Sequence, residues 1–346
     1  MQFIKPDINI DFIGKRRIAF TISLLLILGS FVSLLIKGGL SYGIDFAGGT
    51  LIQVRFDGPV SVPDIKKGLA QEGITNPSIQ SFGEADTHEF LIRIDDSSTA
   101  EGESADKLEA ALNSATGKAA EIRRTEMVGP QVGKDLREKA LFAMFYALLF
   151  ITIYISGRFE MKWMVSGLMA ICLAGAVYLL TAFHVGVPFL MLAALVVTLV
   201  LFWFLELKYA MGAIVALIHD VIITVGVFSV FDKEFSLPIV AALLTIIGYS
   251  LNDTIIVFDR IRENLRKHHR QPMESLINRS INETLSRTIL TSGTTLIVLV
   301  ALFVLGGSII HDFAFALTIG VVVGTYSSIY VASPILLAWQ RRTGKK

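Results

Sequence analysis

The chain has 346 residues, of which 53% are hydrophobic and 18% are charged, and its formal net charge is +1. This composition is far more apolar than that of a soluble globular protein and indicates a membrane protein. The near-zero net charge gives no reason to expect a nucleic-acid partner. The single cysteine, Cys172, excludes a disulfide framework and a cysteine-based zinc site. We expect no cofactor.

The first apolar run extends from Ile18 to Ile36 and follows the basic triplet 15–17. No small-residue cleavage site of the usual kind comes after it, so we interpret it as a permanent first span and not as a cleaved signal peptide. Eight stretches in all approach the roughly 20 apolar residues that a spanning helix needs. They are 18–36, 140–156, 163–183, 187–207, 209–230, 237–258, 288–306 and 313–338. Only Glu206 and Lys208 separate the fourth stretch from the fifth, and we expect a tight turn there.

The charged residues predict the orientation of these spans. Arginine and lysine gather in the N-terminal arm, in the turn 157–162, in the loop expected at 259–287 and in the tail, whereas the loops on the alternate side carry at most one each. Because cytoplasmic loops are enriched in positive charge, we expect both termini to be cytoplasmic. The mixed-charge segment 134–139 lies on the outer side, and we interpret it as an amphipathic lead-in helix at the membrane surface.

The segment 38–133 is polar and acidic, with eight lysines and arginines against fifteen aspartates and glutamates. Its pattern predicts, in chain order, a strand at 50–56, a helix at 61–72, strands at 78–82 and 89–95, a helix at 104–115 and a strand at 119–127. This βαββαβ order is typical of the ferredoxin-like fold. The sequence therefore predicts an α-helical polytopic membrane protein with one exported α+β domain. Its parts are the cytoplasmic arm and first span (1–37), the exported domain (38–133), the helix bundle (134–340) and the cytoplasmic tail (341–346).

Two short segments, 158–163 and 204–209, resemble each other, and each lies between two predicted spans. We interpret this similarity as a duplicated helical hairpin. The second copy leads into His219-Asp220, whereas the equivalent positions of the first copy are Leu173-Ala174. If the copies are related, only the second one has polar groups inside the membrane.

Three polar positions lie inside the predicted spans. His219-Asp220 is near the midplane, Asn252-Asp253 is in the cytoplasmic half of the next span, and Arg287 opens the following span. An ionisable group at mid-bilayer costs about 2.5–3.5 kcal/mol on insertion scales, so we expect these groups to have a function. At about 1.5 Å per residue, Asp253 and Arg287 fall in the same layer and are close enough to pair. If a conformational change makes and breaks that contact, Asp253 takes up and releases a proton in step with it. We therefore hypothesise a proton path.

Each of these positions also has a purely structural explanation. Arg287 is then a charge that snorkels to the interface. Asp253 is then a hydrogen-bonding group between helices, and Asp220 pairs with His219 or another neighbour for packing alone. The sequence does not decide between these explanations and the proton path.

Small residues elsewhere in the spans are expected to permit close helix packing. They are Ser292-Gly293-Thr294-Thr295 and the pair Gly320 and Gly324. The segment 129–134 resembles a P-loop but is one residue short, and it lacks the hydroxyl residue after the lysine. We therefore expect a loop before a span there, no nucleotide site and no enzymatic activity.

Several long motifs resemble the SecF branch of the SecD/SecF family of the Sec protein-export machinery. They are, in chain order, Gly43-Ile-Asp-Phe-Ala-Gly-Gly-Thr50, Ala216-Leu-Ile-His-Asp-Val-Ile-Ile-Thr224, the segment 248–264 (GYSLNDTIIVFDRIREN) and Arg287-Thr-Ile-Leu-Thr-Ser-Gly-Thr-Thr295. The resemblance spans nearly the whole chain. The modest size of the exported domain fits SecF better than SecD.

The resemblance implies an RND-type membrane unit in which SecF pairs with SecD and joins the SecYEG channel, often with YajC. This unit uses the proton-motive force across the bacterial inner membrane to complete the export of a preprotein. The motif match places Asp253 and Arg287 on the family's intramembrane residues linked to proton conduction, and Asp220 on the polar position of the preceding helix. The exported signature falls on Gly43, Asp45, Gly48 and Gly49, whose glycines suit a tight turn.

The chain departs from the family in one respect, because the family usually has six spans and this sequence predicts eight. The excess is a hairpin between about 140 and 207, and it leaves open whether 140–156 or 187–207 takes the usual second position. A passive scaffold for the channel and half of an RND-type small-molecule exporter remain as alternative functions. The basic segment 259–287 would suit anionic membrane lipid, a ribosome or a cytosolic partner, but the positive-inside rule explains it without them.

Overall fold

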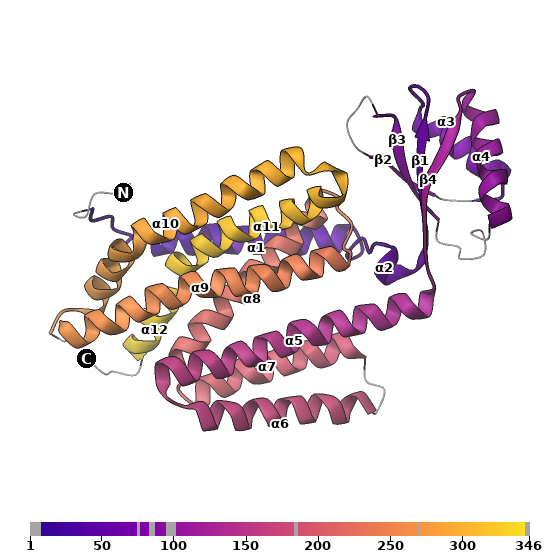
Figure 1. The fold of residues 1–346 in the computed structure, drawn as a ribbon. Helices are drawn as coiled ribbons and strands as arrows, with labels where there is room; N and C mark the ends of the chain where they lie inside the picture. Colours follow the sequence, from indigo (N-terminus) through magenta and orange to yellow (C-terminus); the bar gives the residue numbers. More distant parts are fainter. Residues whose placement is uncertain are drawn as a thin grey trace.

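The computed structural model describes residues 8–74, 77–82, 87–94, 102–182, 186–268 and 270–342. These residues form a bundle of long helices and a separate α+β domain at one end of it (Figure 1). The first described residues and the last helix both lie at the opposite end of the bundle (Figure 1). The first seven residues of the predicted cytoplasmic arm and the tail beyond Arg342 lie outside the described residues.

The α+β domain has the element order that the sequence predicts. Its elements are β1 (Gly49–Phe56), α3 (Val62–Gln71), β2 (Ser78–Phe82), β3 (Glu89–Ile94), α4 (Gly102–Thr116) and β4 (Ala120–Val128). The sheet is antiparallel throughout, in the order β2-β3-β1-β4. Alternate residues of β1, such as Ile52 and Val54, are buried against Ile65 of α3 and Leu112 of α4. This alternation is what a strand with one covered face requires.

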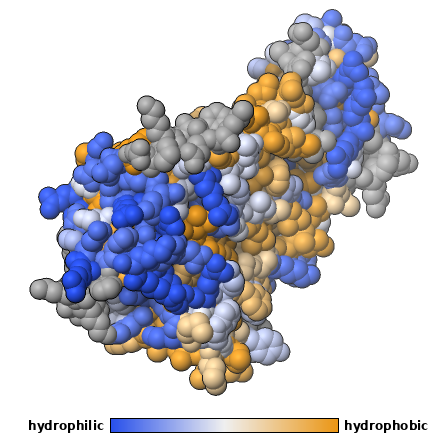
Figure 2. Space-filling view, turned by 60° about the vertical axis from the view of Figure 1, so that its left-hand side comes forward, coloured by the Kyte–Doolittle hydropathy of each residue, from blue (hydrophilic) through white to orange (hydrophobic). Residues whose placement is uncertain are grey.

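The bundle consists of apolar helices. They are α1 (Arg16–Ile36), α5 (Pro130–Glu160), α6 (Trp163–Ala182), α7 (Val187–Phe204), α8 (Lys208–Val230), α9 (Leu237–Lys267), α10 (Met273–Leu305), α11 (Gly307–Ser327), the short π-helix η3 (Ser328–Ala332) and α12 (Ser333–Arg342). Among the described residues, seven helices are long and apolar enough to cross a membrane, and α7 is a shorter apolar helix. An apolar belt separates two hydrophilic ends (Figure 2). The protein is therefore a multi-pass membrane protein.

All eight predicted stretches are helical, but three boundaries differ from the prediction. The charged segment 134–139 is not a separate surface helix, because α5 begins at Pro130 and continues through it. The basic segment 259–287 is mostly helical, since α9 and α10 extend well past their apolar parts. The turn between α7 and α8 is where it was expected, and its Glu206 has a left-handed backbone (φ 54°).

Helix α8 lies at the centre of the bundle, where it contacts α1, α5, α7, α9 and α11. The helices α5, α6 and α7 form a layer on one side of it (Figure 1). On the other side, α11 approaches α9 closely through two glycines. A Cβ atom at Gly320 would overlap the side chain of Ile246, and one at Gly324 would lie 2.8 Å from Ser250 Cβ. These contacts confirm the packing role predicted for the two glycines.

Candidate functional site

Asp220 of α8 is fully buried and accepts three hydrogen bonds. His219 Nδ1 lies 2.9 Å from Asp220 Oδ1. The hydroxyls of Ser250 in α9 and Ser327 in α11 donate to Asp220 Oδ2 at 2.6 and 2.8 Å. Ser327 directly precedes the π-helix η3, a distortion that is frequent at functional sites. This carboxylate therefore joins three helices, and its hydrogen-bonding capacity is well used.

His219 connects Asp220 to the first helix. Its Nε2 atom lies 3.0 Å from the hydroxyl of Ser23 in α1, and Ser23 Oγ lies 3.1 Å from the hydroxyl of Tyr326. The rings of His219 and Tyr326 stack with centroids 6.0 Å apart. Tyr326 in turn donates to the carbonyl of Ala19 at 2.6 Å. A hydrogen-bonded chain thus crosses from α11 through α1 and α8 to α9.

Asp253 of α9 is buried but much less well hydrogen-bonded. Only 1% of its surface is exposed, and its Oδ2 atom accepts one long bond, 3.4 Å, from Ser292 of α10. Ser292 Oγ also lies 2.7 Å from Thr325 Oγ1 of α11. One turn before Ser292, the buried Thr288 hydroxyl has no hydrogen-bond partner among the described residues. The Asp253 carboxylate therefore retains unused hydrogen-bonding capacity, in contrast to that of Asp220.

The two remaining predicted residues, Asn252 and Arg287, lie on the outer surface of α9 and α10. Arg287 is within electrostatic range of Asp253. Among the described ion pairs, however, none joins these two residues within 4.0 Å, so the pairing that the sequence suggested is absent from this conformation. Asn252 is adjacent to Asp253 in the chain but faces away from the bundle, because successive helix residues are rotated by about 100°.

Two hydrogen-bonded groups of polar side chains, one around Asp220 and one around Asp253, lie inside the bundle, and we call them together the polar layer. It consists of Ser23, His219, Asp220, Ser250, Asp253, Ser292, Thr325, Tyr326 and Ser327. Its ionisable members were predictable from the sequence, whereas most of its hydroxyls were not. Ser292 was predicted to permit close helix packing, and its hydroxyl in addition bonds to two neighbouring helices, which was not predicted. Small polar residues recurring in apolar helices were the available signal.

The exported signature connects the α+β domain to the bundle through the short helix α2 (Ile44–Ala47). The backbone N–H of Gly43 donates to the carbonyl of Phe235 at 2.9 Å. Asp45 Oδ2 accepts from the backbone N–H of Leu237, the first residue of α9, at 2.9 Å. A carboxylate at a helix N-terminus satisfies an otherwise free donor and complements the helix dipole. Asp45 therefore holds the beginning of the helix that carries Asp253.

Two glycines of the signature have positive φ angles, a backbone conformation that favours glycine. Gly48 and Gly49 have φ values of 80° and 111°. A Cβ atom at Gly48 would lie 2.9 Å from Pro130 Cα, and one at Gly133 would lie 3.0 Å from Gly48 N. The tight turn that the sequence predicted is present, and it lets the start of α5 pack directly against the signature.

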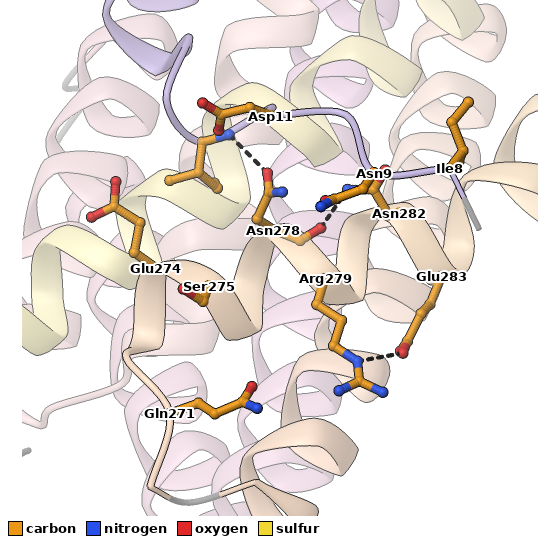
Figure 3. Close-up of a pocket in the computed structure, with 11 residues that line it drawn as sticks. Ile8, Asn9, Asp11, Gln271, Glu274, Ser275, Asn278, Arg279, Asn282 and Glu283 are labelled. Carbon is orange, nitrogen blue, oxygen red and sulfur yellow. Dashed lines mark hydrogen bonds and ion pairs between the residues drawn. The ribbon is translucent and has the colours of Figure 1, made fainter. Parts of the chain in front are cut away.

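A separate polar pocket of about 560 Å³ lies at the bundle end that carries the first described residues. Asn278 and Asn282 of α10, one turn apart, hold the arm there, with Asn278 Nδ2 donating to Ile10 O at 3.0 Å and Asn282 Oδ1 accepting from Ile10 N at 2.8 Å. Figure 3 shows both amides directed at the arm, and Arg279 paired with Glu283 away from it. Sequence analysis did not predict this contact.

Comparison with known protein families and relatives shows which family this chain belongs to. Residues 107–189 and 181–342 match the family described as protein export membrane protein SecD/SecF, C-terminal, and residues 32–60 match the SecD/SecF GG motif. The chain belongs to the SecD/SecF family. The GG motif match covers α2 and the glycine turn, and the C-terminal match covers every helix of the polar layer except α1.

Full-length relatives bear the name protein translocase subunit SecF. The chain is 45% identical to that of Magnetococcus marinus, over 97% of this chain and 94% of the relative. It is 41% identical to that of Vibrio alginolyticus, over 97% of this chain and 91% of the relative.

Among solved structures, SecDF from Thermus thermophilus, described as a translocon-associated membrane protein, matches with a TM-score of 0.72 and 34% identity. That match covers 98% of this chain, which spans 40% of the SecDF chain. A second SecDF structure, in the super-membrane-facing form, matches with a TM-score of 0.63 and 34% identity.

Proposed function

We propose that this chain is an accessory subunit of the protein translocase. It pairs with a SecD subunit and uses the proton-motive force to promote late, trans-side steps of preprotein translocation through SecYEG, with YajC as a further partner. Membership of the SecD/SecF family supports the export role. The state of Asp253 in the polar layer supports the use of protons, and it is the observation on which the proposal depends.

Asp253 is held much less tightly than Asp220. Asp220 has three hydrogen-bond donors, so any change in its protonation or position disrupts contacts among three helices. Asp253 accepts one long bond and lies within electrostatic range of an arginine. A buried carboxylate with such weak constraints changes partners and protonation at low cost. Asp253 is therefore the proton carrier, while His219 and Asp220 fix the helices around it.

Arg287 and Asn252 act at the surface where SecD packs. Both are exposed on spans, where a polar side chain facing lipid is costly. Most of the apolar part of α10 is likewise not buried within this chain. A partner helix that covers α9 and α10 removes this cost, and it completes the surroundings of Asp253. The chain spans 40% of the SecDF chain, and a SecD partner would supply the remainder of an RND-type unit.

Orientation follows from the distribution of charge. The protein lies in the bacterial inner membrane with both termini in the cytoplasm, because the extensions of α9 and α10 and the chain ends carry most of the basic residues of the bundle. The α+β domain is exported and has the ferredoxin-like strand order. It offers preproteins a folded surface on the far side of the membrane, held to α9 by Asp45.

The hairpin of α6 and α7 is an addition to the usual six spans. Two observations support this. The family match falls into two pieces that overlap between α6 and α7, at residues 181–189. The resembling segments 158–163 and 204–209 also occupy the two corresponding turns, between α5 and α6 and between α7 and α8. An added pair of spans leaves the positions of both termini unchanged.

The test is gradient-dependent export into inner-membrane vesicles that contain the full translocase. We expect Asp253→Asn to reduce the stimulation of export by the proton-motive force at least tenfold. The reason is that an amide side chain, unlike a carboxylate, does not take up and release a proton near neutral pH. The matched control is Asp106→Asn, the same change at an exposed position of α4. Unchanged stimulation in Asp253→Asn would refute proton use and leave a passive scaffold as the function.

A further inference from the structure

An apolar groove opens between α5, α7 and α8 on the side of the bundle where α6 and α7 pack. Its volume is about 270 Å³. Its wall includes Leu141, Leu148 and Leu149 of α5, Met191 and Leu195 of α7, and Ile214 of α8. The α7 wall belongs to the α6–α7 hairpin, so the groove exists only because that hairpin is present.

The groove presents almost only carbon atoms to an occupant. Its two hydroxyls, Thr152 and Thr198, donate to the carbonyls of Leu148 and Ala194 in their own helices, at 2.8 and 2.7 Å. Its walls are apolar parts of α5, α7 and α8, which belong to the membrane-spanning bundle, so hydrocarbon and not water surrounds it. A group the size of a water molecule occupies about 30 Å³. The volume of the groove therefore accommodates roughly nine such groups, which is part of an acyl chain.

Lipid tails are as apolar as leucine, so a groove of this kind does not by itself select one lipid. The residues that would select one kind of lipid lie on α5, beyond the end of the groove. Residues seven apart lie nearly in line on a helix, which aligns Lys134 with Leu141 and Leu148 and places it about 10 Å beyond the groove along the axis. Lys134 is exposed and forms no ion pair with any described residue. Arg137 lies on the same face and over the ring of Tyr42, 5.4 Å from its centroid.

We propose that this groove binds one glycerophospholipid, with an acyl chain between α5 and α7 and the phosphate at Lys134 and Arg137. Glu138 is on the same face, so the cationic pair keeps one net positive charge for the phosphate. In a bilayer, the glycerol and headgroup region lies at the edge of the hydrocarbon core, just beyond the tails. A phosphate about 10 Å beyond the groove is at the position that this arrangement requires. The lipid then fills the seam between the added hairpin and the rest of the bundle.

The experiment uses the full chain, purified in detergent and stripped of lipid, with added phosphatidylglycerol or with diacylglycerol of the same tails. Native mass spectrometry measures the fraction of protein with one bound lipid. We expect phosphatidylglycerol to bind at least tenfold better than diacylglycerol. Leu195→Trp, which fills the groove, lowers phosphatidylglycerol binding at least tenfold. The matched control Leu168→Trp changes an exposed residue of α6 that does not line the groove and leaves binding unchanged.

Lys134→Glu provides a second variant that does not alter the apolar core, because Lys134 is exposed and lies before the apolar part of α5. We expect it to lower phosphatidylglycerol binding at least fivefold and to leave diacylglycerol binding unchanged. Equal binding of the two lipids by the unmodified chain would overturn the proposal. Full binding by Leu195→Trp, or full binding by Lys134→Glu, would overturn it as well.

Discussion

Truncation of the two buried aspartates to alanine should affect stability very differently. Asp220→Ala removes three hydrogen bonds, two of them to other helices. Hydrogen bonds in membrane bundles contribute on average about 0.6 and at most about 1.7 kcal/mol each, so the loss is about 2–5 kcal/mol. Asp253→Ala removes one bond of 3.4 Å, at the long limit for such contacts, and should cost at most about 0.6 kcal/mol from hydrogen bonding.

The comparison is informative because the two variants are otherwise matched. Both shorten the same side chain at a position that is at most 1% exposed, so the loss of packing is similar and largely cancels in the difference. The free energy of unfolding is measured by titration of the detergent-solubilised chain with sodium dodecyl sulfate. We expect Asp220→Ala to unfold at clearly lower denaturant. Equal destabilisation by the two variants, or a larger effect of Asp253→Ala, would contradict the division between a structural and a mobile carboxylate.

Substitutions at three further positions test other contacts of the bundle. Asp45→Ala removes the acceptor at the start of α9 and should destabilise the chain by about 0.5–2 kcal/mol in the same titration, whereas Asp45→Asn, which keeps an acceptor, should retain most of the stability. Gly324→Val places a branched side chain against Ser250 and should cost about 1–3 kcal/mol, and wild-type stability would show that the close approach of α11 to α9 is not required. Asn278→Leu should release the arm and speed its cleavage in limited proteolysis at least severalfold, while cleavage at the wild-type rate would show that Asn282 holds it alone.

The sequence predicted the helices of the bundle and the order of strands and helices along the α+β domain, because both depend on the local hydrophobic pattern. Apolar runs of membrane length and the alternation in β1 leave few alternatives. The same reasoning did not predict how far α9 and α10 extend into the basic segment, because charged residues with good helix propensity continue a helix as readily as they form a loop. It also did not show that α7 is shorter than the seven helices that are long and apolar enough to cross a membrane.

The polar layer was only partly predictable, for a different reason. A charged residue in an apolar run is conspicuous, and Asp220 and Asp253 were found in this way. The rotation of a helix about its axis depends on its neighbours and is not evident from the sequence. The sequence therefore did not show that Asp253 faces inward while Asn252 faces outward. Nor does it distinguish a serine that permits close packing from one that donates to a carboxylate, and Ser292 does the latter. Such assignments depend on tertiary packing.

The most direct test of the account is a measurement of proton flux. Vesicles that contain this chain with its SecD partner and the channel are given an inward proton gradient, and a pH-sensitive dye records acidification of the lumen. We predict flux for the unmodified complex and for Asp106→Asn, and no flux above protein-free vesicles for Asp253→Asn. Flux at the unmodified rate in Asp253→Asn would contradict the claim that this carboxylate carries the proton.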